Sequence, residues 1–160
     1  MTVTPNDGTG DGPTGTAEVT IQNTAPALTG PTLSASTASV GDTLTCAASA
    51  TDVDPSDTVS LTFAWHDGST GSTYLVTDTD NPGDSLSCTA TADDSDGGVS
   101  VSTAVATVQN TAPVLTGVSV TPASPVVGVL LTCGGSATDA DGDTPTLTYQ
   151  WSDGSTSATY

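Results

Sequence analysis

Val, Leu and Thr recur in short alternating runs along the chain. Alternation with a period of two is typical of β-strands that bury one face, and the clusters of Gly, Pro, Asp and Ser between the runs are typical of turns. No stretch has a convincing helical period. The pattern therefore predicts an all-β protein. In the central part, the predicted strands are Thr32–Ser39, Asp42–Ala50, Thr58–His66, Ser72–Thr77, Asp84–Ala92 and Val99–Gln109.

The alternation also predicts which side chains of two strands share a face. In "TLTCAAS", Leu44 and Cys46 point to the same side of the strand. In "LTFAW", Leu61, Phe63 and Trp65 do so as well. Many short strands separated by turns are typical of β-sandwiches.

Three kinds of marker recur along the chain at one spacing. The recurring pairs are Gln22 and Gln109 (the starts of "QNTAPALTG" and "QNTAPVLTG"), Cys46 and Cys133, and Trp65 and Trp151. The first two pairs are 87 residues apart and the third is 86 apart, so one residue is lost before the second tryptophan. Agreement among independent markers indicates an internal repeat.

The repeat predicts three parts of the chain. Residues 24–110 form one complete unit. Residues 1–23 match its last strands, Cys88–Asn110, and residues 111–160 match its first strands, Thr24–Tyr74. We therefore expect tandem β-sandwich repeats of 87 residues, with a partial repeat at each end.

The charge of the chain restricts its partners. There are no Lys or Arg residues and 18 Asp and Glu residues, which give a formal net charge of −18. Nucleic-acid binding needs basic side chains to neutralise phosphates, so the composition argues against it. An anionic membrane surface would repel the chain, and no apolar run reaches the roughly 18 residues of a membrane helix. The expected partners are cations, neutral glycans and further copies of the same domain.

Cys46, Trp65 and Cys88 have the order and spacing of the immunoglobulin-like core, where a tryptophan on the third strand packs on a disulfide between the sheets. The unit resembles the bacterial Ig-like or PKD-type repeats found in tandem in secreted and surface proteins. The PKD-like stretches are "NTAP", "ATDVD" and "ATDAD", "WHDGST" and "WSDGST", and "ADDSDGG". Two features depart from these families: Leu86 replaces the corner tyrosine of antibody domains, and "WHDG" is shorter than the PKD form W-D-F-G-D-G.

The resemblance implies a disulfide between Cys46 and Cys88, and therefore an oxidising, extracellular or cell-surface location. Cys133 would then find its partner outside this chain or in another copy. The resemblance also implies core packing for Trp65 and Trp151, which the strand alternation favours over stacking on a glycan.

In the resembled fold, the acidic loops gather at the two poles of the sandwich. Carboxylates facing each other across a joint repel one another unless they are splayed, protonated or bridged by a hard cation such as Ca²⁺. "DVD" and "DAD" are similar to a ligand motif of cadherins, although the glutamate motif of that family is absent. The alternative is plain turn chemistry, for which Asp, Gly, Pro and Ser are well suited. The candidate Ca²⁺ ligands are Asp52, Asp54, Asp57, Asp93, Asp94 and Asp96 at one pole, Asp78, Asp80 and Asp84 at the other, and Asp139, Asp141 and Asp143 in the next unit.

The sequence favours a non-catalytic structural repeat of an extracellular rod or filament. His66 is the only histidine, and the chain has neither a G-x-S-x-G turn nor a zinc-type His/Cys spacing. One alternative is a glycan-binding or spacer module of a secreted hydrolase, in which Tyr74 would be an exposed sugar contact. Another is an adhesin ectodomain.

The partial ends suggest how such a filament would form. Residues 1–23 of one copy would add strands to residues 111–160 of another. The counterparts of Leu75–Cys88 are missing from such a pair, which favours a segment of a longer array. A periodic fibre fits both interpretations.

Overall fold

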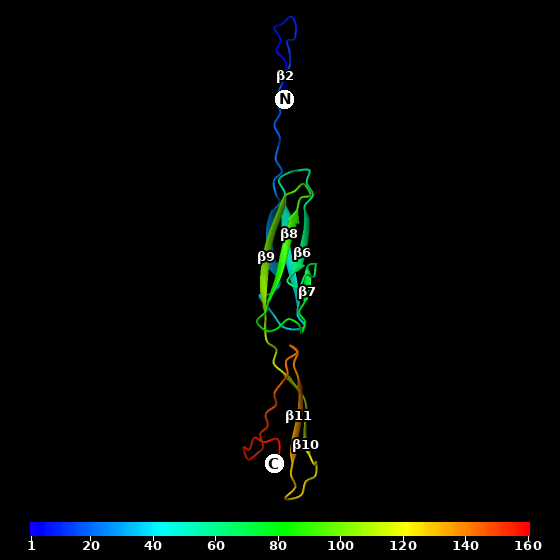
Figure 1. The fold of residues 1–160 in the computed structure, drawn as a ribbon, viewed down its shortest axis with the longest axis vertical. Coiled ribbons are helices and arrows are strands. Elements are labelled where there is room, and N and C mark those ends of the chain that lie inside the picture. The colour runs from blue at the N-terminus through cyan, green and yellow to red at the C-terminus, as the bar shows by residue number, and fades with distance from the viewer.

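The computed structural model describes residues 1–160 and consists of strands, turns and loops. Figure 1 shows a long molecule in which an N-terminal hairpin, a central β-sandwich and a C-terminal hairpin follow one another along the long axis. The strands are β1 (Thr2–Val3), β2 (Gly15–Thr16), β3 (Ala27–Leu33), β4 (Thr37–Ala38), β5 (Thr43–Thr51), β6 (Ser60–Trp65), β7 (Thr73–Leu75), β8 (Ser85–Asp93), β9 (Val99–Val108), β10 (Val114–Thr121) and β11 (Thr132–Thr138). The structure has no helix that is long and apolar enough to cross a membrane.

Two sheets form the central sandwich. One has the strand order β3-β5-β7 and the other the order β4-β9-β8-β6. Neighbouring strands are antiparallel, except that β4 runs parallel to β9. β1 and β2 form a separate two-stranded sheet, as do β10 and β11.

The hydrophobic core lies between the two sheets, where strand alternation places it. Along β8, Leu86, Cys88, Ala90 and Ala92 are fully buried, while the residues between them remain partly exposed. The other core residues are Ala38, Leu44, Cys46, Trp65, Tyr74, Val76, Ala106 and Val108. Several of these side chains are small, so the core contains little apolar volume for its length.

A disulfide between Cys46 and Cys88 joins β5 to β8 and so ties the two sheets together. Trp65 lies opposite Cys88 in the β6–β8 ladder and is buried. Its indole N–H donates a hydrogen bond to the carbonyl of Gly71 at 2.9 Å. Leu44 shares the buried face of Cys46, as the alternation predicted.

The first predicted strand was wrong, whereas the other five agree with the structure to within two residues at each end. The segment Thr32–Ser39 spans two strands in different sheets, because the chain leaves β3 at Leu33 and joins the opposite sheet at β4. β3 also begins earlier than predicted, despite Pro31. This proline is tolerated because β3 is an edge strand and its register shifts between Thr29 and Thr32.

Each terminal hairpin has the same register as a strand pair of the sandwich. The equivalent pairs are Thr2–Thr16 with Thr89–Thr103, and Val114–Thr138 with Ala27–Thr51. We define the counterpart of a residue as the one 87 positions away, or 86 after the lost residue. These registers are what an 87-residue repeat would produce, and the division into residues 1–23, 24–110 and 111–160 stays a prediction that they support.

Replacing both Cys46 and Cys88 with alanine is expected to lower the free energy of unfolding by roughly 3–4 kcal/mol, because the disulfide closes a loop whose ends are 42 residues apart. Urea unfolding followed by Trp65 fluorescence in a Trp151→Phe background measures the loss. Cys133→Ala is the control and should leave the midpoint unchanged. An unaltered midpoint in the double variant would contradict a stabilising role for the bond.

Candidate cation site

Three carboxylates meet in the loop between β5 and β6. Asp52, Asp54 and Asp57 each place an oxygen within 4.8 Å of the other two. Asp52 Oδ1 accepts a hydrogen bond from the Asp54 backbone N–H at 2.9 Å, and Asp54 Oδ2 accepts one from the Thr24 N–H at 2.8 Å. The Oδ2 atoms of Asp52 and Asp57 are buried and have no donor. The loop therefore holds two acceptors that no protein group satisfies.

The surroundings of Asp57 disfavour the ionised form of its carboxyl group. Burial of the carboxyl raises the pKa of Asp57, the charges of Asp96, Asp54 and Asp52 raise it further, and a hydrogen bond from Ser56 opposes the shift. Asp96 belongs to the β8–β9 loop, so the two acidic loops lie at the same pole of the sandwich, where the chain also enters (the entry pole). A divalent cation bound among these oxygens would relieve the repulsion.

Asp94, at the same pole, is an internal anchor. It accepts hydrogen bonds from the Asn23 amide at 2.9 Å, from the Asp96 N–H at 2.8 Å and from the Gly98 N–H at 2.9 Å. These donors, the Asn23 amide above all, lower the pKa of Asp94. Asp93 likewise caps its own turn. Asp93 and Asp94 are therefore engaged in turns, as Asp52 is through its bond to the Asp54 N–H.

Asn23 makes a contact at this pole that sequence reasoning missed, although it belongs to the repeated "QNTAP" stretch. Its bond to Asp94 ties the entering chain to the β8–β9 loop. Gly98 leaves room for this contact, because an added Cβ would collide with the Asp94 carboxylate and lie 2.7 Å from Ala25 Cα. We call the Asn23–Asp94 pair the entry clamp.

At the opposite pole, where the chain leaves the sandwich (the exit pole), Asp80 is buried. The hydroxyl of Tyr74 donates to both of its carboxylate oxygens at 3.0 Å, the N–H of Thr77 donates at 2.9 Å, and His66 Nε2 lies 3.2 Å from Oδ1. Asp84 Oδ2 accepts a hydrogen bond from the backbone N–H of Asn81, three residues before it, at 2.9 Å. These two predicted ligands therefore serve the fold of the β7–β8 loop.

Across the joint from the exit pole lies the loop that follows β11. Asp141 is 3% exposed, its Oδ2 accepts the Thr111 N–H at 2.6 Å, and its Oδ1 is buried without a donor. Asp139 accepts the Asp141 N–H at 2.8 Å. A methyl group on Gly142 would lie 3.8 Å from the carbonyl oxygen of Asp78, so the two loops expected to face each other meet here.

Turn chemistry therefore accounts for several of the predicted Ca²⁺ ligands, and one group of three carboxylates keeps the geometry of a candidate cation site. Asp80, Asp84, Asp93 and Asp94 cap turns, and Asp78 and Asp143 are exposed. The β5–β6 loop alone brings three carboxylates together with free buried oxygens. Ca²⁺ takes six to eight oxygen ligands, which these carboxylates could supply together with loop carbonyls and water.

The aromatic residues are placed for packing. The rings of Trp65 and Tyr74 stack with their centroids 5.1 Å apart, and those of Trp151 and Tyr160 repeat this stack at 5.2 Å. Trp65 is buried and Trp151 is partly buried. Tyr74 is only 9% exposed, so the ring that a glycan contact would need is covered.

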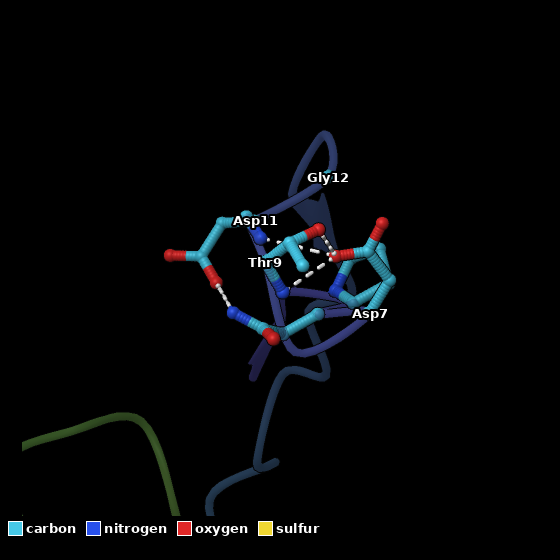
Figure 2. Close-up of a pocket in the computed structure, with 7 residues that line it drawn as sticks. Asp7, Thr9, Asp11 and Gly12 are labelled. Atoms are coloured by element: carbon cyan, nitrogen blue, oxygen red, sulfur yellow. Dashed lines mark hydrogen bonds between the residues drawn. The ribbon is translucent and has the colours of Figure 1, made fainter.

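A hollow of about 410 Å³ lies in the loop between β1 and β2 (Figure 2). There Asp7 Oδ1 accepts hydrogen bonds from the Thr9 hydroxyl at 2.7 Å, the Thr9 N–H at 2.9 Å and the Gly10 N–H at 3.0 Å, which lower the pKa of Asp7. The Asp11 carboxylate accepts the amide of Asn6. The polar groups satisfy one another, so the hollow follows from the turn geometry.

Comparison of the chain with family models, with curated proteins and with solved structures gave no match. The structure by itself establishes an all-β chain with a Cys46–Cys88 disulfide and an acidic cluster in the β5–β6 loop. Its function is therefore inferred from its own residues and their geometry.

Calorimetric titration with CaCl₂ is expected to show binding that Asp57→Asn abolishes, because the substitution removes one of three converging carboxylates. Without Ca²⁺, Asp57→Asn should raise the melting temperature at neutral pH. The pKa of Asp57 is raised in the fold, so its contribution is favourable at low pH and is lost as the pH rises through that pKa. Asp42→Asn, at the other end of β5, is the control and should retain binding. Absence of binding up to millimolar Ca²⁺ would contradict the site.

Tyr74 should make the fold sensitive to alkaline pH. Burial, followed by the hydrogen bond to Asp80, raises its pKa from 10.0 to about 12. The stabilisation is therefore complete below pH 10.0 and is lost as the pH rises towards about 12. Tyr74→Phe should remove the phenolate absorbance that appears near pH 12. At neutral pH it should also lower the free energy of unfolding by about 1–3 kcal/mol, because Asp80 loses a donor. Tyr160→Phe is the control and should leave the free energy of unfolding unchanged, and an equal loss of stability in the two variants would refute the assignment.

Proposed function

We propose that the chain is a non-catalytic structural part of an extracellular or cell-surface rod. The observation that carries this proposal is the path of the chain through the sandwich. The chain enters at one pole and leaves at the other, and the parts before and after it continue along the same axis (Figure 1). Units joined in this way stack end to end, and each one contacts only its neighbours.

The distribution of charge supports a spacer. The acids of the sandwich lie in or next to its loops, whereas the outward positions of its strands are mostly Thr, Ser, Val and Ala. On the β9-β8-β6 face, for example, Thr103, Thr89 and Ala64 lie side by side. A rod of such units has charged joints and uncharged, hydroxyl-rich sides. Repulsion between the joints favours an extended arrangement over a collapsed one.

The joints have features that limit bending. At the entry pole, the Thr24 N–H donates to Asp54 at 2.8 Å, and in the next unit the Thr111 N–H donates to Asp141 at 2.6 Å. Each "NTAP" stretch also ends in a proline, which fixes φ and restricts the residue before it. At each of these two places, the entering chain is therefore held against the unit that follows.

Two further observations support an exposed, oxidising location. The Cys46–Cys88 disulfide suits the outside of a cell better than a reducing cytosol. The absence of Lys and Arg leaves no site for trypsin-type proteases. His66, the only histidine, contacts Asp80 and Tyr74, which supports a role in the fold.

The glycan-binding alternative depends on an exposed aromatic platform. Tyr74 is covered by Trp65 and held by Asp80, so it does not offer an open ring face. This burial favours the spacer over the glycan-binding module.

Small-angle X-ray scattering should report a rod whose stiffness depends on Asp141. For the wild-type chain at low concentration, we expect the distance distribution of an elongated particle. Asp141→Ala removes the acceptor of the Thr111 N–H, so it should broaden that distribution and shorten the mean length. Asp143→Ala changes an exposed acid of the same loop and should leave the profile unchanged. A compact profile for the wild type would overturn the proposal.

A further inference from the structure

The loop after β11 buries a carboxylate oxygen that no group of the chain satisfies. Asp141 is 3% exposed, and its Oδ1 atom is buried without a hydrogen-bond donor, whereas its Oδ2 atom accepts the Thr111 N–H at 2.6 Å. The hydroxyl oxygen of Thr111 is also buried without a partner. Burial of a carboxylate costs free energy unless donors or a cation compensate its charge. Two neighbouring residues at this place therefore have polar atoms that the protein itself does not satisfy.

The complete sandwich shows that its own loops do not bring a donor to this position. Asp54 is the counterpart of Asp141 and belongs to the complete sandwich, yet its carboxylate accepts only the Thr24 N–H, at 2.8 Å. Asp54 is partly exposed and Thr24 is exposed, so water can reach both. The unsatisfied oxygen of Asp141 is therefore not explained by a loop of its own unit.

The joint with the preceding sandwich accounts for the deeper burial of Asp141. Figure 1 shows the loop after β11 next to the exit pole. A Cβ added to Gly142 would lie 3.8 Å from the carbonyl oxygen of Asp78 and 3.9 Å from its Cβ atom. The β7–β8 loop of the sandwich thus passes beside this segment, and the group that it brings there is a carbonyl acceptor.

The chain has no positively charged side chain to place in the joint. It contains no Lys or Arg, and its one histidine, His66, lies 3.2 Å from Asp80 through Nε2. The groups at the joint are the carboxylates of Asp139 and Asp141, a hydroxyl and a backbone carbonyl, all of which offer oxygen. Ca²⁺ binds such oxygen groups in flexible geometry, whereas Mg²⁺ keeps several waters and zinc prefers imidazole or thiolate.

We propose that a divalent cation of the Ca²⁺ type binds in the joint, between the exit pole and the loop after β11. Its ligands from the following unit are Asp141 Oδ1, the Asp139 carboxylate and the Thr111 hydroxyl. The Asp78 carbonyl is the ligand from the sandwich, and water completes the coordination. The cation neutralises two carboxylates and ties one unit to the next. This inference rests on the proposed rod and names what stiffens its joint.

This joint site is separate from the group of three carboxylates in the β5–β6 loop, which lies at the entry pole. Calorimetric titration with CaCl₂ isolates the joint site in a full chain that carries Asp57→Asn, because this substitution removes the binding at the entry pole. Binding of a single ion should persist in that chain at neutral pH.

Asp141→Asn, added to Asp57→Asn, should weaken the remaining binding by at least about tenfold, because the affinity of such sites depends on their charged ligands. The Asn oxygen can still accept the Thr111 N–H, so the loop should keep its fold. Asp143→Asn changes an exposed acid of the same loop and is the matched control. No binding to the Asp57→Asn chain up to millimolar Ca²⁺, or equal binding by the Asp141→Asn and Asp143→Asn chains, would overturn the joint site.

Thr111→Val tests the hydroxyl ligand, because it removes the unsatisfied oxygen and keeps the N–H that bonds to Asp141. In the Asp57→Asn chain it should weaken binding severalfold. Thr24→Val, at the counterpart position of the entry pole, should have no effect there. An equal loss of affinity in the two valine variants would exclude Thr111 from the ligands.

Small-angle X-ray scattering distinguishes failure of the joint site from failure of the rod. In the Asp57→Asn chain, Ca²⁺ should narrow the distance distribution relative to the same protein with a chelator, and Asp141→Asn should abolish this difference. Binding without any change in the distribution would overturn the stiffening role. An elongated profile with no binding would overturn the joint site alone, whereas a compact profile with and without Ca²⁺ would overturn the rod.

Discussion

The bond between Cys46 and Cys88 is the constraint on which the sandwich depends. Only 4% of the residues are aromatic, and much of the core consists of alanine and valine, so apolar burial is limited. A cross-link spanning 42 residues offsets this by removing about 4 kcal/mol of chain entropy from the unfolded state. It also fixes the distance between β5 and β8, so Trp65 has a defined surface on which to pack. The strand pattern, the tyrosine network and the polar loops are built around that pair of sheets.

Sequence reasoning predicted most of the fold because alternation and repetition are visible without coordinates. Five of six strands and the disulfide agree with the structure, and the terminal hairpins have the registers that the repeat implies. It failed at the start of the sandwich, where one apolar run contributes to two sheets. Nothing local indicates that the chain crosses between sheets after Leu33, since the crossing is set by the later strands β5 and β9.

The acidic loops could be predicted as a group but not residue by residue. Two aspartates in a D-x-D spacing can either cap a turn or bind a metal ion. Which of the two roles an aspartate can take depends on whether other segments of the chain supply hydrogen-bond donors to its carboxylate. Asp94 is saturated because Asn23 arrives from the entering chain, whereas Asp57 receives only a hydroxyl from Ser56 and the charges of its neighbours. Such partners come from distant parts of the sequence, so spacing alone cannot distinguish the two roles. The same holds for Tyr74: Trp65 stacks on its ring and Asp80 accepts its hydroxyl, and the spacing of the sequence indicates neither contact.

The disulfide has a mechanical consequence for a chain pulled along its length. Tension enters the sandwich through β3 and leaves through β9, which contact each other and are loaded in shear. If these strands separate, the residues between Cys46 and Cys88 still cannot extend, because the disulfide joins their ends. At roughly 3.5 Å per residue, about 150 Å of chain therefore stays unextended. Each unit would then yield by a bounded step and keep β5 and β8 together. A fibre of such units would have a built-in limit to its stretch.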